Sequence, residues 1–161
     1  MQGSKGTNVK AIVNHMSLLQ NAKTSIDLGI EDYKLGVAGD EKRFVSAIRN
    51  IYAGIILLLK HKLQRLSPSA DPDLLILRDI SVVRDRTKRR VVFKGVGSKT
   101  IDFHEIQKRF KSLRIKADWK ILGEINKVRN DLEHYFSPHT KEQARKTVSD
   151  AGFNREVQHP A

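Results

Sequence analysis

The stretch that decides the fold is "DEKRFVSAIRNIYAGIILLLKHKLQRL", residues 40–66. Its apolar residues recur mostly at steps of three and four, the spacing of an amphipathic helix, and extra leucines widen the apolar face. Asp40 stands before this pattern as an N-cap, and "SPSADPD", residues 67–73, ends it with two prolines. We therefore predict that residues 40–66 form the central and most buried helix.

A second amphipathic pattern precedes this helix. Apolar residues spaced mostly three, four or seven apart predict a helix over about residues 8–33, with Thr7 or Asn8 as its N-cap. Gly29 and Gly36 weaken the pattern toward its end, and a break near Asn21 is compatible with it. The first part of the chain therefore predicts two long helices in succession.

Two prolines and small polar residues separate the second helix from a segment of different character. Residues 74–101 are rich in Val and Ile, which favours β structure, and the strongest strand patterns cover residues 80–84 and 89–93. "DRTK" and "GVGS" interrupt these patterns. We predict a β-hairpin insertion there, and the alternative interpretation is a flexible basic loop.

Helical signals return after the insertion. Asp102 and Glu105 have the spacing of a capping box and predict a short helix to about Leu113. Asp118 caps a further helix over residues 119–135, which "FSPH" ends because the residue before a proline disfavours helical geometry. A last short helix, starting at Ser137 or Thr140, is predicted over residues 141–151. The expected fold is a mainly all-α, up-and-down bundle of four or five helices.

Length and composition bound the class of protein. The chain has 161 residues and no cysteine, which predicts one domain over residues 8–151 with loose termini at 1–7 and 152–161. The longest apolar run, residues 51–59, is too short to span a bilayer, and "MQGSKGTNVK" lacks the hydrophobic region of a signal peptide. We expect a cytoplasmic protein that has no membrane partner.

Positive charge is concentrated in one segment. The net charge is +12, and residues 78–116 hold 13 basic and 4 acidic side chains, so most of the excess lies there. "RDRTKRR" would carry its five basic residues at the tip of the hairpin, as a surface for RNA or an acidic partner protein: Arg84, Arg86, Lys88, Arg89 and Arg90. The alternative is a solvated surface without a partner.

The stretch "RNDLEHYFSP", residues 129–138, places polar residues at the end of the helix predicted over 119–135. On a helical wheel centred on Ile121, the residues Ile125, Val128, Leu132 and Tyr135 form the core face. Asn130 and His134 fall about 180° and 220° away, opposite the core, and Arg129 lies on the flank at about 80°. Asn130 and His134 are an i, i+4 pair, so their side chains are expected to be neighbours.

"RNDLEH", residues 129–134, resembles the R-x4-H motif of the HEPN domains, including a polar residue directly after the arginine. HEPN domains are bundles of four or five helices with this motif near the end of a late helix. The resemblance implies a metal-independent endoribonuclease that is a toxin or defence effector and cuts single-stranded RNA as a homodimer. It also implies an alternative, a non-catalytic binding module for a cognate or neighbouring-gene protein such as a nucleotidyltransferase antitoxin.

The chemistry of RNA cleavage gives each motif residue a role. Attack by the 2′-hydroxyl requires proton transfer, which a histidine can perform near neutral pH, so His134 is the candidate acid or base. Arg129 is the candidate clamp for the phosphate, and Asn130 would orient His134 or bind the phosphate. Arg49 lies at the edge of the apolar face of its helix and is within possible reach of this site.

Plainer interpretations remain beside these roles. Arg129 can pair with Glu133 at i+4, and His134 suits the negative end of a helix dipole. A helical nucleic-acid-binding protein without catalysis is a third class. "VFKGVGSKT" lacks the spacing of a P-loop. No other histidines stand at metal-binding spacing beside carboxylates, so we expect neither a metal nor another cofactor (His15, His61, His104, His139, His159).

Overall fold

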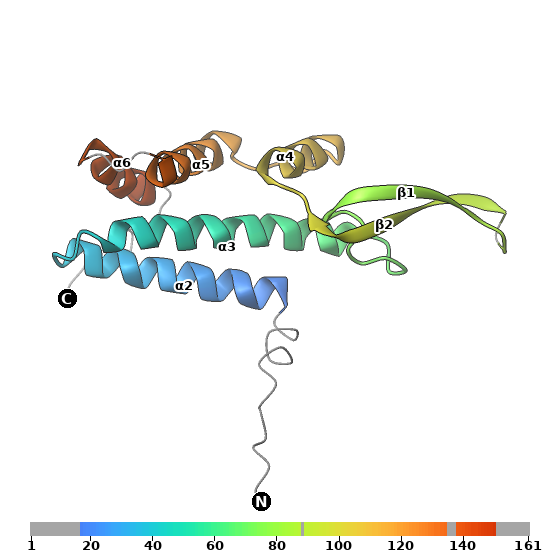
Figure 1. The fold of residues 1–161 in the computed structure, drawn as a ribbon, viewed down its shortest axis with the longest axis horizontal. Coiled ribbons are helices and arrows are strands. Elements are labelled where there is room, and N and C mark those ends of the chain that lie inside the picture. The colour runs from blue at the N-terminus through green and yellow to red at the C-terminus, as the bar shows by residue number, and fades with distance from the viewer. Residues whose placement is uncertain (1–16, 88, 135–137, 151–161) are drawn as a thin grey trace, which may run out of the picture.

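The computed structural model describes residues 17–87, 89–134 and 138–150 (Figure 1). Lys88, Tyr135 and the predicted N-caps Thr7 and Asn8 lie outside them, as do both terminal segments. The elements are α2 (Leu18–Val37), α3 (Arg43–Leu66), β1 (Leu77–Asp85), β2 (Arg90–Thr100), α4 (Phe103–Ser112), α5 (Trp119–His134) and α6 (Pro138–Val148). The prediction of a mainly helical chain with a β-hairpin after two long helices is confirmed.

Helices α2 and α3 lie side by side in close contact (Figure 1). Small residues of α2 recur every seven positions on the face toward α3, namely Ala22, Gly29 and Gly36, and all are buried. A Cβ atom built on Gly29 would lie 2.6 Å from Ile51 Cγ1 and 3.1 Å from the carbonyl oxygen of Ala47. The glycines therefore let the two helices approach more closely than any larger side chain would permit.

The other side of α3 is covered by α4, α5 and α6, which places α3 between two layers of helices (Figure 1). One buried cluster joins α3 to α2, α5 and α6, with Ile48, Ile51 and Leu132 among its members. A second joins the end of α3 to α4 and the base of the hairpin through Leu63, Ile101 and Phe110, among others. The prediction of a long helix in this segment is confirmed over Arg43–Leu66, and α3 contacts every other described helix.

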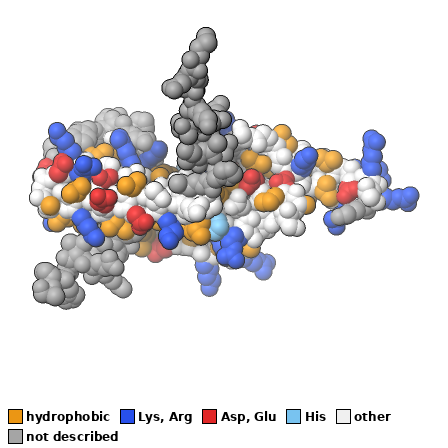
Figure 2. Space-filling model, turned by 90° about the horizontal axis from the view of Figure 1, so that it is seen from below, with side chains coloured by type: hydrophobic (Ala, Val, Ile, Leu, Met, Phe, Trp, Pro, Cys, Tyr) orange, Lys and Arg blue, Asp and Glu red, His pale blue; other side chains and the backbone are white. Residues whose placement is uncertain are grey.

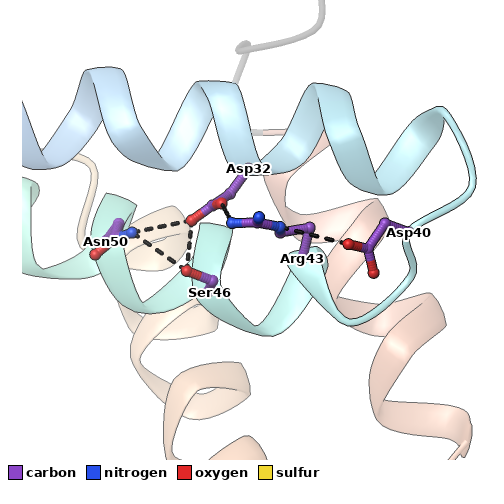
Figure 3. A network of polar contacts seen from close by, with 5 residues as sticks. All are labelled: Asp32, Asp40, Arg43, Ser46 and Asn50. Carbon is purple, nitrogen blue, oxygen red and sulfur yellow. Dashed lines mark hydrogen bonds and ion pairs between the residues drawn. The ribbon is translucent and has the colours of Figure 1, made fainter.

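A polar network fastens α2 to α3 at a buried position (Figure 3). Asp32 is only 8% exposed, and its carboxylate accepts hydrogen bonds from Arg43 Nη1 at 2.9 Å, from Ser46 Oγ and from Asn50 Nδ2 at 3.1 Å. Arg43 also pairs with Asp40 at 3.5 Å. The hydrogen bond and charge of Asp32 raise the pKa of Arg43. Three donors offset the cost of burying the Asp32 carboxylate, so the network fixes how the helices align.

The hairpin extends beyond the end of the helices (Figure 1). Its strands pair antiparallel, with Val82 opposite Phe93 and Asp85 opposite Arg90. Arg86, Thr87 and Arg89 lie in a turn, as predicted at "DRTK". The predicted interruption at "GVGS" is wrong, because β2 continues through it. The segment instead contains a register shift, with Gly97 at a φ of 76°, a bulge that glycine permits without ending the strand.

Several helix ends differ from their predicted positions. Helix α2 begins at Leu18, where Ser17 and Gln20 form a capping box, and it passes through Gly29 and Gly36 to Val37, beyond the predicted end at 33. The part of the helix predicted before Ser17 lies outside the described residues. Asp40 is not an N-cap, because α3 starts after Lys42 without a side-chain cap. Helix α6 spans Pro138–Val148, which agrees with the predicted start at Ser137 rather than the one at Thr140, and it ends before the predicted residue 151. Proline is well suited to a first helical turn, where its missing N–H costs nothing.

By length and composition, α3 is apolar enough to cross a membrane, with a mean hydropathy of 1.2 over 18 residues. The same composition is typical of a central helix in a helical protein. In this fold α3 packs against α2, α4, α5 and α6.

Candidate functional site

Helix α5 holds the motif, and its register follows from its cap and its apolar stripe. Asp118 Oδ1 accepts a hydrogen bond from the backbone N–H of Ile121 at 3.1 Å, which confirms the predicted cap. Ile125, Val128 and Leu132 are buried, as the helical wheel predicted. This packing leaves Arg129 and Asn130 beside the core, and both are partly buried.

The Arg129 guanidinium is held between two helices. Its Nη1 donates a hydrogen bond to Asn130 Oδ1 at 2.9 Å, and its Cζ lies 5.2 Å from the centroid of the Tyr52 ring on α3. A guanidinium above an aromatic face is attracted by the ring quadrupole. Asn130 therefore orients Arg129 in this structure. The wheel places Asn130 opposite the core, yet in the structure its side chain is partly buried and bonded to Arg129.

His134 is the last residue of α5, one helical turn after Asn130. The side chains of His134 and Glu133 lie outside the described part of the structure. The contacts predicted between His134 and Asn130, and between Glu133 and Arg129, are therefore untested.

A pocket of about 580 Å³ opens beside Arg129. Helix α3 contributes Arg49, Tyr52, Ala53, Ile56, Leu57 and Lys60, and the segment that leads from β2 into α4 contributes Ile101, Asp102 and Phe103. The lining thus combines three cationic side chains with one carboxylate, two aromatic rings and four aliphatic side chains. The structure brings Arg49 and Arg129 to the same pocket, as the position of Arg49 on its helix had suggested.

Two charged residues at the far end of the pocket are tied to the start of α4. Lys60 Nζ donates a hydrogen bond to Thr100 Oγ1 at 2.8 Å, and burial lowers the Lys60 pKa. Asp102 accepts a hydrogen bond from the backbone N–H of Glu105 at 2.9 Å, which is the main cause that lowers the Asp102 pKa. Asp102 therefore serves both as the cap of α4 and as part of the pocket wall.

The predicted basic residues of the hairpin lie elsewhere. Arg84, Arg86, Arg89 and Arg90 lie at the end of the hairpin away from the helices, where Figure 2 shows a group of Lys and Arg side chains. Figure 1 places this end far from α5. The structure therefore does not join the basic hairpin and the motif into one site within a single chain.

One face of the hairpin is apolar and exposed. Val82 and Phe93 stand opposite each other, Val91 and Ile80 lie on the same face, and the first three side chains are 66%, 61% and 62% exposed. A two-stranded hairpin alone buries too little to be stable, so such a face is typical of a surface that contacts another molecule.

A second pocket, of about 610 Å³, lies between α5 and α6. Its wall mixes acidic residues such as Asp118 and Asp131 with lysines such as Lys127 and Lys146. These opposite charges largely compensate, so the pocket has little bias toward an anion. Among the described side chains, no three His, Asp or Glu residues converge as metal ligands would.

Sequence reasoning missed Tyr52, Lys60, Asp102 and Phe103 as pocket residues. Tyr52 and Lys60 follow Arg49 by three and eleven positions, so they share one side of a helix, but that side is mostly apolar and reads as core. That this side of α3 lines a pocket becomes evident only in the structure, where Arg129 of α5 lies beside it.

Comparisons with protein-family models, with curated proteins and with solved structures found no match.

Proposed function

We propose that the protein is a HEPN-like, metal-independent endoribonuclease that cuts single-stranded RNA in the cytoplasm as a toxin or defence effector. The proposal includes the up-and-down bundle of four or five helices and the homodimer of that family. The observation that carries it is the Arg129 guanidinium, held by Asn130 and Tyr52 at the edge of a pocket with two further cations. A fixed guanidinium is suited to binding phosphate through two N–H groups.

In the proposed reaction, the 2′-hydroxyl of the RNA attacks the adjacent phosphate. Its proton passes to a histidine, the bond to the 5′-oxygen breaks, and that oxygen receives a proton, which leaves a cyclic phosphate. His134 is the proposed acid or base, and Arg129 stabilises the charge that develops on the phosphate. Asn130 acts by orienting Arg129. In a homodimer, two His134 side chains would divide the two proton transfers.

The test is RNA cleavage in EDTA by the wild type and by His134→Ala. The control is His104→Ala, which removes an exposed histidine of α4 that packs on Phe103 but does not itself line the pocket. We expect cleavage by the wild type and the control and a loss of at least about a hundredfold in His134→Ala, the usual contribution of proton transfer. Arg129→Lys should also lower the rate, because lysine lacks the planar fork. Equal cleavage by wild type and His134→Ala would contradict the proposal.

A second candidate function is a non-catalytic binding module for a partner protein, such as a nucleotidyltransferase antitoxin encoded nearby. The exposed apolar face of the hairpin beside its basic end favours it. Neutralising Arg86, Arg89 and Arg90 together should then weaken co-purification with the neighbouring-gene protein, whereas His134→Ala should leave it unchanged. Binding that is insensitive to the hairpin variant excludes the hairpin as the docking surface.

A further inference from the structure

We propose that the pocket beside Arg129 is a subsite for single-stranded RNA, in which phosphates contact Arg49 and Lys60 and bases lie against Tyr52 and Phe103. This inference rests on the proposed function, because it takes RNA as the ligand of the adjoining motif. It adds the surface that selects an unpaired strand and the direction in which the strand runs, along α3.

The pocket residues of α3 are spaced at regular steps along the helix. Arg49, Tyr52, Ile56 and Lys60 follow one another at steps of three or four, which keeps them on one side of the helix. Arg49 and Lys60 are therefore separated by about 16 Å along the axis. Successive phosphates of a stacked strand advance about 3.4 Å, so this length holds several nucleotides.

The pocket residues between Arg49 and Lys60 are aromatic and aliphatic. Tyr52 from α3 and Phe103 from the start of α4 line the pocket together with Ile56 and Leu57. The Arg129 guanidinium lies over one face of the Tyr52 ring, and Phe103 packs edge-to-face with His104 and Trp119. A base would therefore use the remaining exposed parts of both rings. Proteins that bind single strands combine cationic contacts to the backbone with aromatic rings on which bases stack. The bases of a duplex are paired with each other and are therefore not available to contact these aromatic rings.

The side chains that line the pocket carry a net positive charge. Arg49, Lys60 and Arg129 outnumber the single carboxylate of the pocket, Asp102, whose charge already receives the backbone N–H of Glu105. A polyanion therefore meets a net positive surface. An acidic peptide would satisfy the cations as well, but it does not explain two aromatic rings beside the proposed phosphate clamp.

The experiment measures RNA binding separately from cleavage. A fluorescently labelled, unstructured oligoribonucleotide is titrated with His134→Ala protein in EDTA, and anisotropy is followed over a range of salt. Arg49→Gln is compared with Arg65→Gln, a matched control because Arg65 is also exposed on α3 but does not line the pocket. Tyr52→Leu tests the base contact, and circular dichroism confirms that each variant is folded.

We expect Arg49→Gln to weaken binding several-fold and to reduce the slope of log K against log salt by about one. Tyr52→Leu should weaken binding about tenfold, the typical effect of losing one stacked base. Arg65→Gln should do neither. The inference is overturned if Arg49→Gln and Arg65→Gln weaken binding equally, if Tyr52→Leu has no effect, if a duplex of the same sequence binds as tightly, or if no RNA binding is measurable.

The failure of this inference can be told apart from failure of the proposed catalysis. If the wild type cuts RNA but Arg49→Gln and Tyr52→Leu bind it normally, the subsite is wrong and the motif stands. If the wild type does not cut RNA but both substitutions weaken binding, the subsite stands and the protein is a binding module.

Discussion

Asp102 serves two purposes at one position. Its side chain closes the capping box of α4 with Glu105, and it also forms part of the pocket that holds Lys60 and Arg129. The capping interaction uses the ionised carboxylate, which accepts the hydrogen bond more strongly than the neutral acid does. The stability that Asp102 contributes should therefore depend on pH.

We predict that Asp102→Ala destabilises the protein by about 0.5–2 kcal/mol at neutral pH, the range for losing a cap. The folded-state pKa of Asp102 lies below its ordinary value of 3.8, so the contribution is present above that pH and is lost as pH falls through the folded pKa. Thermal unfolding of both proteins between neutral and strongly acidic pH measures it. A difference in unfolding free energy that does not shrink in acid contradicts the prediction, and Asp102→Asn controls for the cap geometry.

Two helical glycines, Gly54 in α3 and Gly123 in α5, differ in how much space surrounds them. A Cβ atom on Gly54 would lie 2.5 Å from Ile26 Cγ1 and 2.9 Å from the carbonyl oxygen of Ala22, whereas one on Gly123 would meet nothing within 4 Å. We predict that Gly54→Ala destabilises the protein by about 1–3 kcal/mol through overpacking. Gly123→Ala should instead stabilise it by up to about 1 kcal/mol through helix propensity.

Chemical denaturation of the two alanine variants measures both effects. A loss of stability in Gly54→Ala no larger than the change in Gly123→Ala would mean that the contact between α2 and α3 relaxes easily. The pair is matched because each variant adds the same methyl group to a helical glycine.

At the scale of elements, the helices form most of the two buried clusters, and the hairpin projects from them (Figure 1). Its exposed apolar face contributes little to either buried cluster, and only its base, at Ile76 and Ile101, belongs to one. Ile80 and Gly95 pair directly, so a two-residue turn can join them.

We predict that replacing residues 81–94 with Asn-Gly leaves the helices intact, because the removed side chains are mostly exposed. The melting temperature should change by only a few degrees, as for a change of about 1 kcal/mol. Circular dichroism and thermal unfolding measure this. Loss of the helical signal would show that the hairpin is part of the folding unit. If the basic end binds RNA, the variant should also bind with a smaller salt dependence.

The elements also show what sequence patterns determine. Helix α4, its capping box and the core face of α5 were predictable, because each depends on neighbours within one turn. The prediction of Asp40 as an N-cap was wrong because a good capping residue does not fix where a helix starts. Helix α3 begins after Lys42, and the Asp40 carboxylate pairs with Arg43. The contact of Arg129 with Tyr52 was not predictable, since it depends on how α5 packs on α3 and no periodicity contains that information.

At the scale of the whole molecule, the two positive surfaces of one chain are far apart. The basic end of the hairpin lies far from α5, the helix that carries Arg129 (Figure 1). A second copy would bring a second set of both, and the proposed homodimer would then have a longer cationic surface than the monomer. Long anionic ligands gain affinity from several such contacts held at fixed distances.

We predict that the purified protein has twice the monomer mass in solution, measured by light scattering after size exclusion. The dimer should persist at high salt if apolar surface forms its interface, since such contacts are not screened. A monomer mass at concentrations where RNA is cut would contradict the dimeric site, and cleavage would then need acid and base from one chain.

The close pairing of α2 and α3 has a consequence for the order of folding. The two helices are joined by only five residues, 38–42, so their contacts cost little loop-closure entropy, whereas α4 to α6 must return to α3 across the hairpin. We expect amide protection in α2 and α3 to appear first in pulse-labelled hydrogen exchange. During synthesis the growing chain would then form a helical hairpin before Arg129 is added, and the motif would dock onto a surface that is already ordered.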